Sequence, residues 1–597
     1  HVSCCHPPLS RAHRMPPPRG DVLRNAEVAA LLDEIADLLE LKGESRFRIG
    51  AYRTAARRIE NLAEAVEDLW ASGHLEDMPG VGESIAAKVG EYLKTGRSSY
   101  LDSLRKEVAP GLRDLLAVPG VGPARAQIIH RELGIRTIAE LEEAARQHRL
   151  RTLPGIREKT EEKILREVER LQQRTRRMLL GVALPAAEEV VRLLKDDPLV
   201  RRIEPAGSLR RMRETIGDID LLASSEHPEK VTEAFARLPI VKEVLGRGPT
   251  KASVLTRDNL QIDLRVVEPE AYGAALQYFT GNKEHNIALR EIAIRRGYKL
   301  SEYGLFDGAT GRRLAGEDEA DVYRRLGLEW MPPELRENRG ELEAAATGRL
   351  PHLVAQEDLK ADLQMHTDWS DGSATLEEMA EACRRMGYRY AVISDHSQGL
   401  GVARGLSPER LEEQRREIER LNRRVAPFRL LAGSEVDIRS DGSLDYPDQV
   451  LSRLELVIAA VHSGFEQSGE RMTERMIRAI RNPHVDVLAL PPGRLLGRRE
   501  GYEVDLERVL QEAARLGVAV EINASPERLD LNDVWSRRAR ELGVKLAIDS
   551  DAHAPAQLAF ARYGVAVARR GWLEKGDVLN ALPLDDLLAW RRRRRSA

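Results

Sequence analysis

The amino-acid sequence predicts a multidomain protein with an α-helical first third, an α+β middle third and a C-terminal α/β barrel. Three observations support this fold class. The chain has 597 residues, which exceeds the size of a single hydrophobic core. Pro-Gly turns recur in the first third, and each precedes a helical pattern of apolar residues. From Asp358 onward, short apolar strands alternate with helices, which is typical of repeated βα units.

The composition limits the class of protein. The formal net charge is −3 and 32% of the residues are charged, so nucleic-acid binding would need local basic faces rather than a basic surface overall. No run of about 18 apolar residues occurs, so we expect no membrane span. Residues 1–20 lack the apolar core of a secretory signal, and we expect a disordered tail in which Met15 is a candidate for the true start. The cysteines Cys4, Cys5 and Cys383 suit a reducing cytosol, so we expect a cytoplasmic protein in which Cys383 packs inside a helix.

The first third reads as helical and basic. Apolar residues recur at steps of three and four from Asn25 to Leu69, and Phe47 to Ile59 forms a basic amphipathic pattern. A solvated charged face is the alternative interpretation of that basic pattern.

Three related turns follow these helices. The first contains Gly80 and Gly82, the second contains Gly120 and Gly122, and a degenerate third contains Gly155. Glycine permits the positive φ of a tight turn, and the turn amides together with the next helix N-terminus form a nest for a phosphate. Plain helical turns are the alternative. The repeated pattern resembles helix-hairpin-helix elements, which bind the DNA backbone without reading its sequence.

The stretch from Gly207 to Asp220 carries the chemistry predicted for the middle third. A Gly-Ser turn and arginines come first, and Asp218 and Asp220 then stand at the start of an apolar strand. Positions i and i+2 of a strand face the same way, so these two carboxylates should form a pair. We also expect strands at residues 203–208 and 260–267, and Asp263 lies on the polar face of the latter. Three carboxylates on adjacent strands suit two-metal phosphoryl transfer, whereas three exposed strand aspartates are the alternative.

The middle third resembles the palm and thumb of the X-family DNA polymerases, the relatives of polymerase beta. The resemblance rests on Gly207-Ser208, the run from Gly217 to Asp220, Asp263 and the Tyr-Phe-Thr-Gly segment that begins at Tyr278. It implies catalytic and metal-binding roles, with Mg²⁺ or Mn²⁺, for Asp218, Asp220 and Asp263. It implies nucleotide-binding roles for Gly207, Ser208, Arg211, Gly217, Tyr278, Phe279, Gly281, Asn286 and Arg290.

The same resemblance implies which part of the nucleotide or DNA each of these residues contacts. Ser208 and Arg211 would contact the triphosphate of the incoming nucleotide. Tyr278 and Phe279 would pack on its sugar and disfavour ribonucleotides, and Asn286 with Arg290 would reach the minor groove of the new base pair.

One departure concerns the first turn. Eukaryotic relatives with deoxyribose-phosphate lyase activity carry a Schiff-base lysine just after it, and Ser84 appears at the corresponding position here. A serine cannot form the imine. Lys88 stands one helical turn further on, but we do not expect lyase chemistry.

The last third predicts a second metal site. The polar stretch from Arg336 to Gln356 predicts a linker, and the strands that follow end in histidines and acids. Ligands at the carboxyl ends of barrel strands converge at one mouth, whereas a single histidine would more often be a satisfied core residue. The expected strands are residues 390–394, 430–435, 456–461, 485–490, 518–522 and 545–548. The metal ligands predicted from this pattern are His366, His396, Glu435, His462, Asp551 and His553.

This last third resembles the PHP (polymerase and histidinol phosphatase) domain fused to many bacterial X-family polymerases. Active relatives bind a trinuclear metal cluster and hydrolyse phosphoesters. The resemblance implies Asp371 as a seventh metal ligand, Mn²⁺ or Zn²⁺ as the metal, and a 3′–5′ exonuclease. The sequence departs from the family pattern twice, because Gln364 and Leu490 stand where histidines are usual. A glutamine amide oxygen is a weaker ligand and leucine offers none, so an inactive, structural or DNA-guiding barrel is the competing interpretation.

Arginines occupy every position from Arg591 to Arg595. They could contact phosphates, and a solvated tail is the alternative. The predicted domain boundaries are a tail at 1–20, helical DNA-binding regions at 21–100 and 101–176, a palm at 177–268, a thumb at 269–345, a linker at 346–357 and the barrel at 358–597.

These observations predict a monomeric, template-directed DNA polymerase that fills short gaps during base excision repair. Its partners would be gapped or primer-template DNA and deoxynucleoside triphosphates, without a membrane. One alternative makes the barrel the main enzyme, a Mn²⁺-dependent nuclease on a DNA-binding arm. Another is a DNA-binding scaffold with degenerate sites.

Overall fold

The computed structural model describes residues 21–595 apart from residues 43, 61–65, 79, 96, 109–111, 117, 119 and 175–176. The predicted disordered tail, with Cys4, Cys5 and Met15, lies outside the described residues. The chain divides into two compact units between residues 173 and 174. Within the described residues, no helix is long and apolar enough to cross a membrane.

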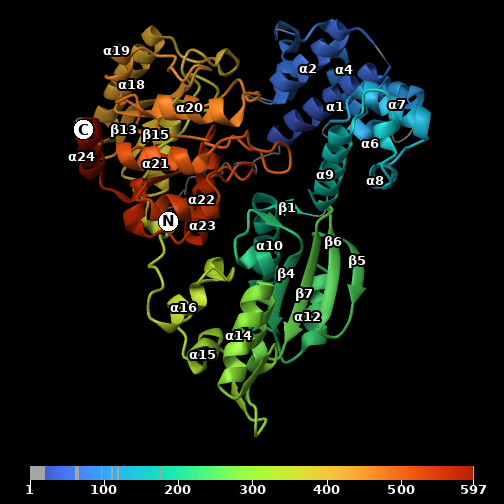
Figure 1. The fold of residues 1–597 in the computed structure, drawn as a ribbon, viewed down its shortest axis with the longest axis vertical. Coiled ribbons are helices and arrows are strands. Elements are labelled where there is room, and N and C mark those ends of the chain that lie inside the picture. The colour runs from blue at the N-terminus through green and yellow to red at the C-terminus, as the bar shows by residue number, and fades with distance from the viewer. Residues whose placement is uncertain are drawn as a thin grey trace, which may run out of the picture. The chain divides into compact units, whose positions relative to one another are not determined.

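The first unit is helical, as predicted (Figure 1). Residues such as Ile35, Leu39 and Ile59 are fully buried in its core. Its described α-helices are α1 (Asp21–Leu41), α2 (Arg46–Glu60), α3 (Val66–Ala71), α4 (Glu83–Thr95), α5 (Ser99–Glu107), α6 (Leu112–Leu116), α7 (Pro123–Leu133), α8 (Ile138–Arg146) and α9 (Glu158–Arg174).

The three predicted turns share one backbone geometry. Gly80, Gly120 and Gly155 have φ values of 88°, 94° and 79°, which confirms the left-handed conformation predicted for the Pro-Gly turns. In each turn the residue after this glycine donates its amide to the carbonyl three residues earlier, at 2.9, 2.9 and 3.2 Å. Helices α4, α7 and α9 begin within three residues of these glycines.

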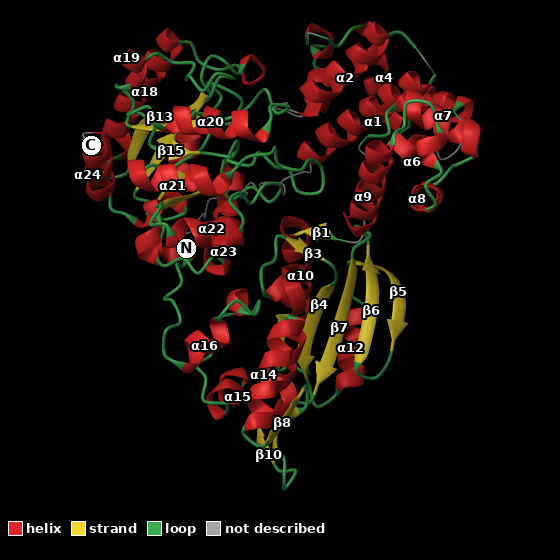
Figure 2. Ribbon diagram, viewed as in Figure 1, coloured by secondary structure: helices red, strands yellow, loops and turns green. Residues whose placement is uncertain are grey.

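The second unit begins with a five-stranded sheet in the order β2-β4-β7-β6-β5 (Figure 2). Strands β4 and β7 are parallel, and the other neighbours in this sheet are antiparallel. The predicted strand at residues 203–208 is shorter than expected, because a turn of helix begins at Gly207. The elements are β1 (Met178–Leu179), α10 (Leu180–Lys195), β2 (Arg202–Pro205), α11 (Gly207–Arg210), β3 (Thr215–Ile216), β4 (Ile219–Ser224), α12 (Pro228–Ala236), β5 (Val241–Arg247), β6 (Lys251–Thr256) and β7 (Gln261–Val267).

A smaller helical region with a three-stranded antiparallel sheet, ordered β10-β9-β8, follows. Its elements are α13 (Tyr272–Thr280), α14 (Lys283–Arg295), β8 (Tyr298–Ser301), β9 (Gly304–Asp307), β10 (Arg313–Ala315), α15 (Glu319–Arg325) and α16 (Glu341–Ala346).

The linker interpretation of the stretch from Arg336 to Gln356 is wrong at its start. Arg336 is fully buried and its Nη1 donates to Glu319 Oε1 at 2.6 Å. Glu341 is also fully buried and lies 2.7 Å from Nδ1 of the buried His285. A buried charge with a partner belongs to a folded core rather than to a solvated connection.

The last part is a parallel seven-stranded sheet whose order follows the chain, β11 to β17. A parallel bridge between Met365 and Ala552 joins the segments after its first and last strands, so the sheet curls into a barrel. Its strands are β11 (Ala361–Asp362), β12 (Tyr390–Ile393), β13 (Arg429–Asp437), β14 (Leu456–Ala460), β15 (Val487–Leu488), β16 (Ala519–Asn523) and β17 (Leu546–Asp549).

Helices surround this barrel (Figure 1). Cys383 is fully buried in one of them, which confirms its predicted packing role. They are α17 (Leu376–Arg385), α18 (Pro408–Val425), α19 (Asp448–Leu451), α20 (Gly469–Ile480), α21 (Leu506–Leu516), α22 (Asp533–Glu541), α23 (Ala561–Arg570) and α24 (Leu584–Arg595).

Three of the five arginines in the run have a role that neither interpretation describes. The run forms the last turns of α24, and Arg591, Arg594 and Arg595 converge on Asp486, a fully buried residue just before β15, whereas Arg592 and Arg593 are exposed. Arg594 Nη2 lies 2.8 Å from Asp486 Oδ1, and Arg591 and Arg595 also pair with this carboxylate. These arginines therefore compensate a buried charge at the amino-terminal end of the barrel strands.

Candidate functional site

The predicted carboxylates of the five-stranded sheet come together at one edge. Asp220 on β4 is the register partner of Asp263 on β7, and Asp218 stands immediately before β4. Gly207 closes this edge with φ of 59°, and a Cβ there would lie 2.9 Å from Asp220 Oδ2. Only glycine therefore fits beside the aspartates.

The charges of this edge are unequally compensated. Burial and the negative charges of Asp218 and Asp263 raise the pKa of Asp220 to about 6. Burial would also raise the pKa of Asp263, but hydrogen bonds from Lys251, Gln261 and Ser253 hold it below its usual value. Lys251 Nζ lies 2.9 Å from Asp263 Oδ2. The excess negative charge around Asp220 is the arrangement that a divalent cation neutralises.

The raised pKa of Asp220 predicts a cost to stability. Its folded-state value of about 6 exceeds an unfolded value of ~3.9, so folding is penalised at neutral pH and the penalty fades as the pH falls through 6 towards 4. In chelator at pH 7.5, Asp220→Asn should therefore raise the thermal midpoint by about 4 °C. The difference should shrink at pH 4.5, and equal midpoints at pH 7.5 would contradict the prediction.

The predicted nucleotide-binding residues lie around the same edge, and several already have partners. Arg211 Nε donates to Glu337 Oε1 at 3.0 Å, and its Nη1 donates to the carbonyl oxygen of Thr280. Ser208 lies in α11 and is half-buried. Gly281 follows α13 with φ of 65°, and a Cβ there would lie 3.3 Å from Arg211 Nη1.

The two aromatic residues of α13 contact each other, whereas Asn286 is not presented to solvent. The rings of Tyr278 and Phe279 meet edge to face at 5.1 Å, and the Arg265 guanidinium lies 4.7 Å from the Phe279 ring centre. The Asn286 amide is 9% exposed, donates to the Tyr278 carbonyl at 2.8 Å and accepts from Gln277 Nε2 at 2.8 Å. Groove contact by Asn286 would require these bonds to break, whereas Arg290 is exposed.

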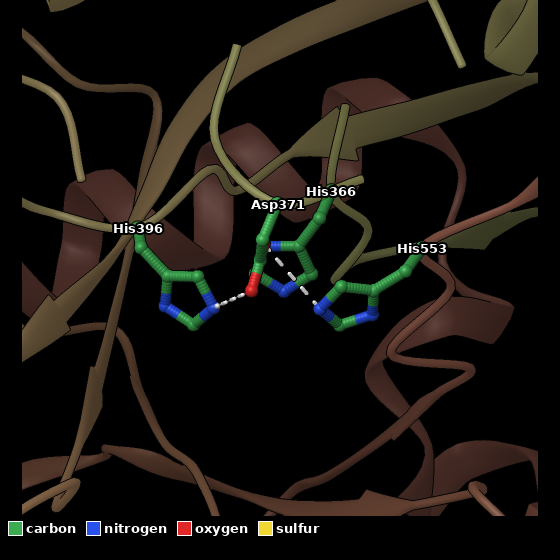
Figure 3. A group of neighbouring side chains, drawn as sticks. All are labelled: His366, Asp371, His396 and His553. Carbon is green, nitrogen blue, oxygen red and sulfur yellow. Dashed lines mark ion pairs between the residues drawn. The ribbon is translucent and has the colours of Figure 1, made fainter. Parts of the chain in front are cut away.

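The mouth of the barrel brings together all seven metal ligands that the sequence predicts for the barrel. Among the described residues, three sets of side chains have ligand atoms within 4.8 Å of one another. They are His366, Asp371, His396 and His553 (Figure 3); His396, Glu435 and His462; and His366, Glu435 and Asp551. Because His366, His396 and Glu435 each belong to two sets, the ligands form one continuous cluster.

The donor atoms of this cluster fit divalent metal ions. Both ring nitrogens of the fully buried His366 lack a hydrogen-bond partner among the described residues, and Nε2 lies 3.2 Å from Asp551 Oδ1. Burial alone would lower the pKa of His462, but the carboxylates of Glu435 and Asp437 raise it to about 9. Imidazole nitrogens and carboxylate oxygens in this mixture suit Mn²⁺ or Zn²⁺.

The two departures from the family pattern behave differently. Gln364 is fully buried two residues before His366, and its amide oxygen and nitrogen make no hydrogen bond to any described residue, so the oxygen is free to act as a ligand. Leu490 packs in an apolar cluster, and its backbone amide donates to Glu521 Oε2 at 3.1 Å. Leu490 therefore contributes no metal ligand.

Two supporting residues were missed by the sequence analysis. Asp437 Oδ1 lies 3.3 Å from His462 Nδ1, and Asn523 Nδ2 donates to Asp551 Oδ2 at 3.0 Å. Asp437 could have been found from its spacing, because it stands two residues after Glu435 and so shares one face of β13. Partners of this kind orient metal ligands.

The lysine after the first turn also has a defined environment. Lys88 Nζ donates to the carbonyl and hydroxyl oxygens of Ser84 at 2.9 and 2.8 Å, and it lies 4.7 Å from the Tyr100 ring centre. Burial and the positive charge of Arg48 lower the pKa of Lys88. A lower pKa leaves more of the side chain as the free amine, the form that condenses with aldehydes.

Comparisons with known families and proteins agree with this division of the chain. Residues 23–98 match a helix-hairpin-helix domain, residues 112–170 match a SAM-like helix-hairpin-helix tandem, and residues 275–337 match the DNA polymerase beta thumb. A probable phosphatase of Thermoanaerobacter sp. is 30% identical over 37% of this chain and 91% of its own. DNA polymerase lambda of Arabidopsis thaliana is 26% identical over 52% of this chain and 62% of its own.

The family assignment rests on a full-length relative. The protein named DNA polymerase/3′-5′ exonuclease PolX from Bacillus subtilis is 39% identical over 96% of this chain and 100% of its own. The chain therefore belongs to the X family of DNA polymerases, as a PolX-type member in which a polymerase-beta-like core is followed by a PHP domain.

Proposed function

We propose that this protein is a template-directed DNA polymerase that fills short gaps in DNA, and that its barrel is a 3′–5′ exonuclease. The observation that carries the polymerase proposal is the register pairing of Asp220 with Asp263 beside Asp218. A palm at residues 177–268 and a thumb at 269–345 complete the core, with a linker at 346–357 that leads into the barrel. The monomeric state, the role in base excision repair and the cytoplasmic location stay predictions.

In the polymerase reaction, Asp218 and Asp220 would hold the Mg²⁺ or Mn²⁺ ions, and Asp263 would complete the ligand set on the side of the primer 3′-hydroxyl. When bound, the ions lower the pKa of this hydroxyl and neutralise the triphosphate and the leaving pyrophosphate. Ser208 and Arg211 orient the triphosphate, while Tyr278 and Phe279 lie against the sugar. Since in-line attack and charge neutralisation carry the reaction, no protein nucleophile is needed.

In the barrel, the seven ligands would hold Mn²⁺ or Zn²⁺ at the cluster described above. When bound, such ions would supply the activation of water that phosphoester hydrolysis needs. Glu435 belongs to two of the ligand sets, so its loss would affect both. The free amide oxygen of Gln364 would add a weak ligand, and we expect fewer ions than in relatives with the complete pattern.

The helix-hairpin-helix turns support binding to gapped or primer-template DNA. Gly80, Gly82, Gly120 and Gly122 place backbone amides at helix N-termini, where phosphates bind. We propose these turns as DNA-backbone contacts.

One gapped duplex tests both activities. Primer extension with deoxynucleoside triphosphates and Mg²⁺ should fill the gap, and Mn²⁺ without nucleotides should shorten a labelled 3′ end. Degradation without extension would favour the barrel as the main enzyme on a DNA-binding arm. Failure of both reactions would favour a DNA-binding scaffold.

The environment of Lys88 favours one additional activity, despite the expectation from Ser84. We propose that the free amine of Lys88 attacks the aldehyde of a 5′-deoxyribose phosphate; water leaves as the imine forms, and loss of a C2′ proton expels the 3′ phosphate.

Borohydride trapping tests this additional activity. The reagent should cross-link the wild-type protein to such DNA, and Lys88→Ala should reduce cross-linking at least about tenfold, since a lysine is the only group in the proposal that forms the imine. Lys94→Ala, on the same helix, is the matched control. Equal cross-linking by the Lys88 variant and its control would contradict the proposal.

A further inference from the structure

The nucleotide-binding loop of the palm is held by side chains of the barrel. This loop, Arg211 to Glu214, joins α11 to β3 and carries the predicted triphosphate contact Arg211. Arg570, at the end of α23, donates through Nη1 to the Arg211 carbonyl oxygen at 2.7 Å. At the other end of the loop, Glu214 Oε2 accepts from Arg494 Nη2 at 2.7 Å.

Arg570 also joins the carboxylate that holds the Arg211 side chain. Its Nη1 donates to Glu337 Oε1 at 3.0 Å and its Nη2 donates to Asp533 Oδ2 at 2.7 Å. Glu337 Oε2 accepts further bonds from Arg213 at 3.3 Å and Asn282 at 3.1 Å. Palm, thumb and barrel therefore meet at one buried carboxylate.

The predicted contact between Arg211 and the triphosphate requires the Arg211 side chain to change partners. Its guanidinium must leave Glu337 to reach a triphosphate, and removing a counter-charge from a buried carboxylate would oppose that movement. Because Arg570 is only 4% exposed and remains bound to Asp533, it can keep Glu337 compensated while Arg211 moves. Its bond to the Arg211 carbonyl fixes the backbone during the same step.

A second contact to the palm loop comes from Arg494, in the barrel segment where Leu490 replaces the usual metal ligand. Arg494 follows Leu490 by four residues, and its guanidinium is anchored by Asp530 and by the Arg528 carbonyl oxygen at 3.0 Å. The strand end that offers no metal ligand at Leu490 thus carries a second contact to the palm loop.

We propose that Arg570 is a positioning residue for nucleotidyl transfer, through which the barrel orders the palm loop and allows Arg211 to exchange Glu337 for the incoming triphosphate. This inference rests on the proposed polymerase function. It assigns the barrel a part in polymerisation that does not depend on its metal ligands.

Steady-state gap filling tests the proposal. Arg570→Ala should raise KM for the deoxynucleoside triphosphate roughly tenfold, with a smaller change in kcat. A tenfold change corresponds to the free energy of one charge-assisted hydrogen bond. Arg570→Lys keeps the positive charge near Glu337 and should recover part of this loss. An unchanged KM in Arg570→Ala would overturn the proposal. It would also be overturned if the alanine and lysine variants showed the same rise in KM and the same fall in kcat.

Arg562→Ala is the matched control. Arg562 stands on the same helix and pairs across to the palm through Glu188 at 3.1 Å, but this pair is exposed and does not touch the loop. Its KM should equal that of the wild type. Wild-type protein that fails to extend the primer would refute the polymerase function itself, whereas a normal wild type with an unaltered Arg570→Ala variant refutes only the inference.

A milder pair of variants decides the question if Arg570→Ala does not fold. Glu214→Gln removes the charge that Arg494 holds and leaves the Arg494–Asp530 pair in place. Glu188→Gln removes the equivalent charge opposite Arg562. A rise in KM of about threefold for Glu214→Gln alone supports the proposal, and identical KM values for the two variants overturn it.

Discussion

Replacing both Asp218 and Asp220 with alanine should abolish Mg²⁺-dependent extension of a gapped primer. In the proposed mechanism the paired carboxylates would hold the ions that activate the hydroxyl and neutralise the triphosphate, so their loss should remove several kcal/mol of transition-state stabilisation. We expect the rate to fall at least about 1,000-fold. Extension of a labelled primer by one nucleotide, measured at saturating Mg²⁺, gives the rate directly.

Two controls make this result specific. Asp258→Ala removes an exposed aspartate from the turn between β6 and β7 and should leave extension intact. Degradation of the 3′ end by the barrel should continue in the double variant, which shows that the protein is folded. Extension that survives in the double variant would refute the polymerase assignment.

Replacing His366 with alanine should abolish degradation of the 3′ end and leave gap filling intact, the opposite of the result expected for the double aspartate variant. His366 belongs to two of the three ligand sets, so its loss opens most of the cluster at once. We expect Mn²⁺-dependent shortening of the 3′ end to fall at least about 100-fold, because lost metal ligands and lost activation of water both contribute. Bound metal per chain, measured after dialysis, should fall as well, while gap filling should remain.

The exposed His352 offers a matched control, since His352→Ala removes a histidine outside the cluster. Unchanged 3′ degradation in His366→Ala would show that the barrel is not the nuclease. Loss of degradation together with loss of gap filling would instead mean that the substitution disturbs the whole second unit.

Much of both sites could be predicted from the sequence, because regular spacing determines local geometry. Asp218 and Asp220 stand two residues apart at the start of a strand, so their pairing follows from strand periodicity. Six of the seven barrel ligands, all but Asp371, lie within four residues of a strand end, and a parallel sheet in chain order brings those ends to one rim. Gly80, Gly120 and Gly155 show the positive φ that Pro-Gly turns demand.

Side-chain pairs that depend on tertiary packing could not be predicted from the sequence. Nothing in the sequence near Arg336 indicates that it is buried against Glu319, so the polar stretch predicts a linker where the structure has a folded core. The amide of Asn286 is bonded to Gln277 and Tyr278 in the preceding helix, a contact set by helix packing rather than by sequence distance. The palm partners of Arg570 and Arg494 lie hundreds of residues away, and only the fold brings them together.

The arginines of α24 carry a practical lesson for protein engineering. A basic run is an attractive target for trimming when unwanted affinity for nucleic acid has to be reduced. Here, deleting Arg594 and Arg595 would remove the two nearest counter-charges of the buried Asp486 and leave Arg591, whose Nε lies 3.8 Å away. Such an edit would destabilise the barrel by up to about 3–5 kcal/mol, the usual cost of breaking a buried ion pair. Weaker DNA binding by the destabilised protein would then be mistaken for the loss of a DNA contact.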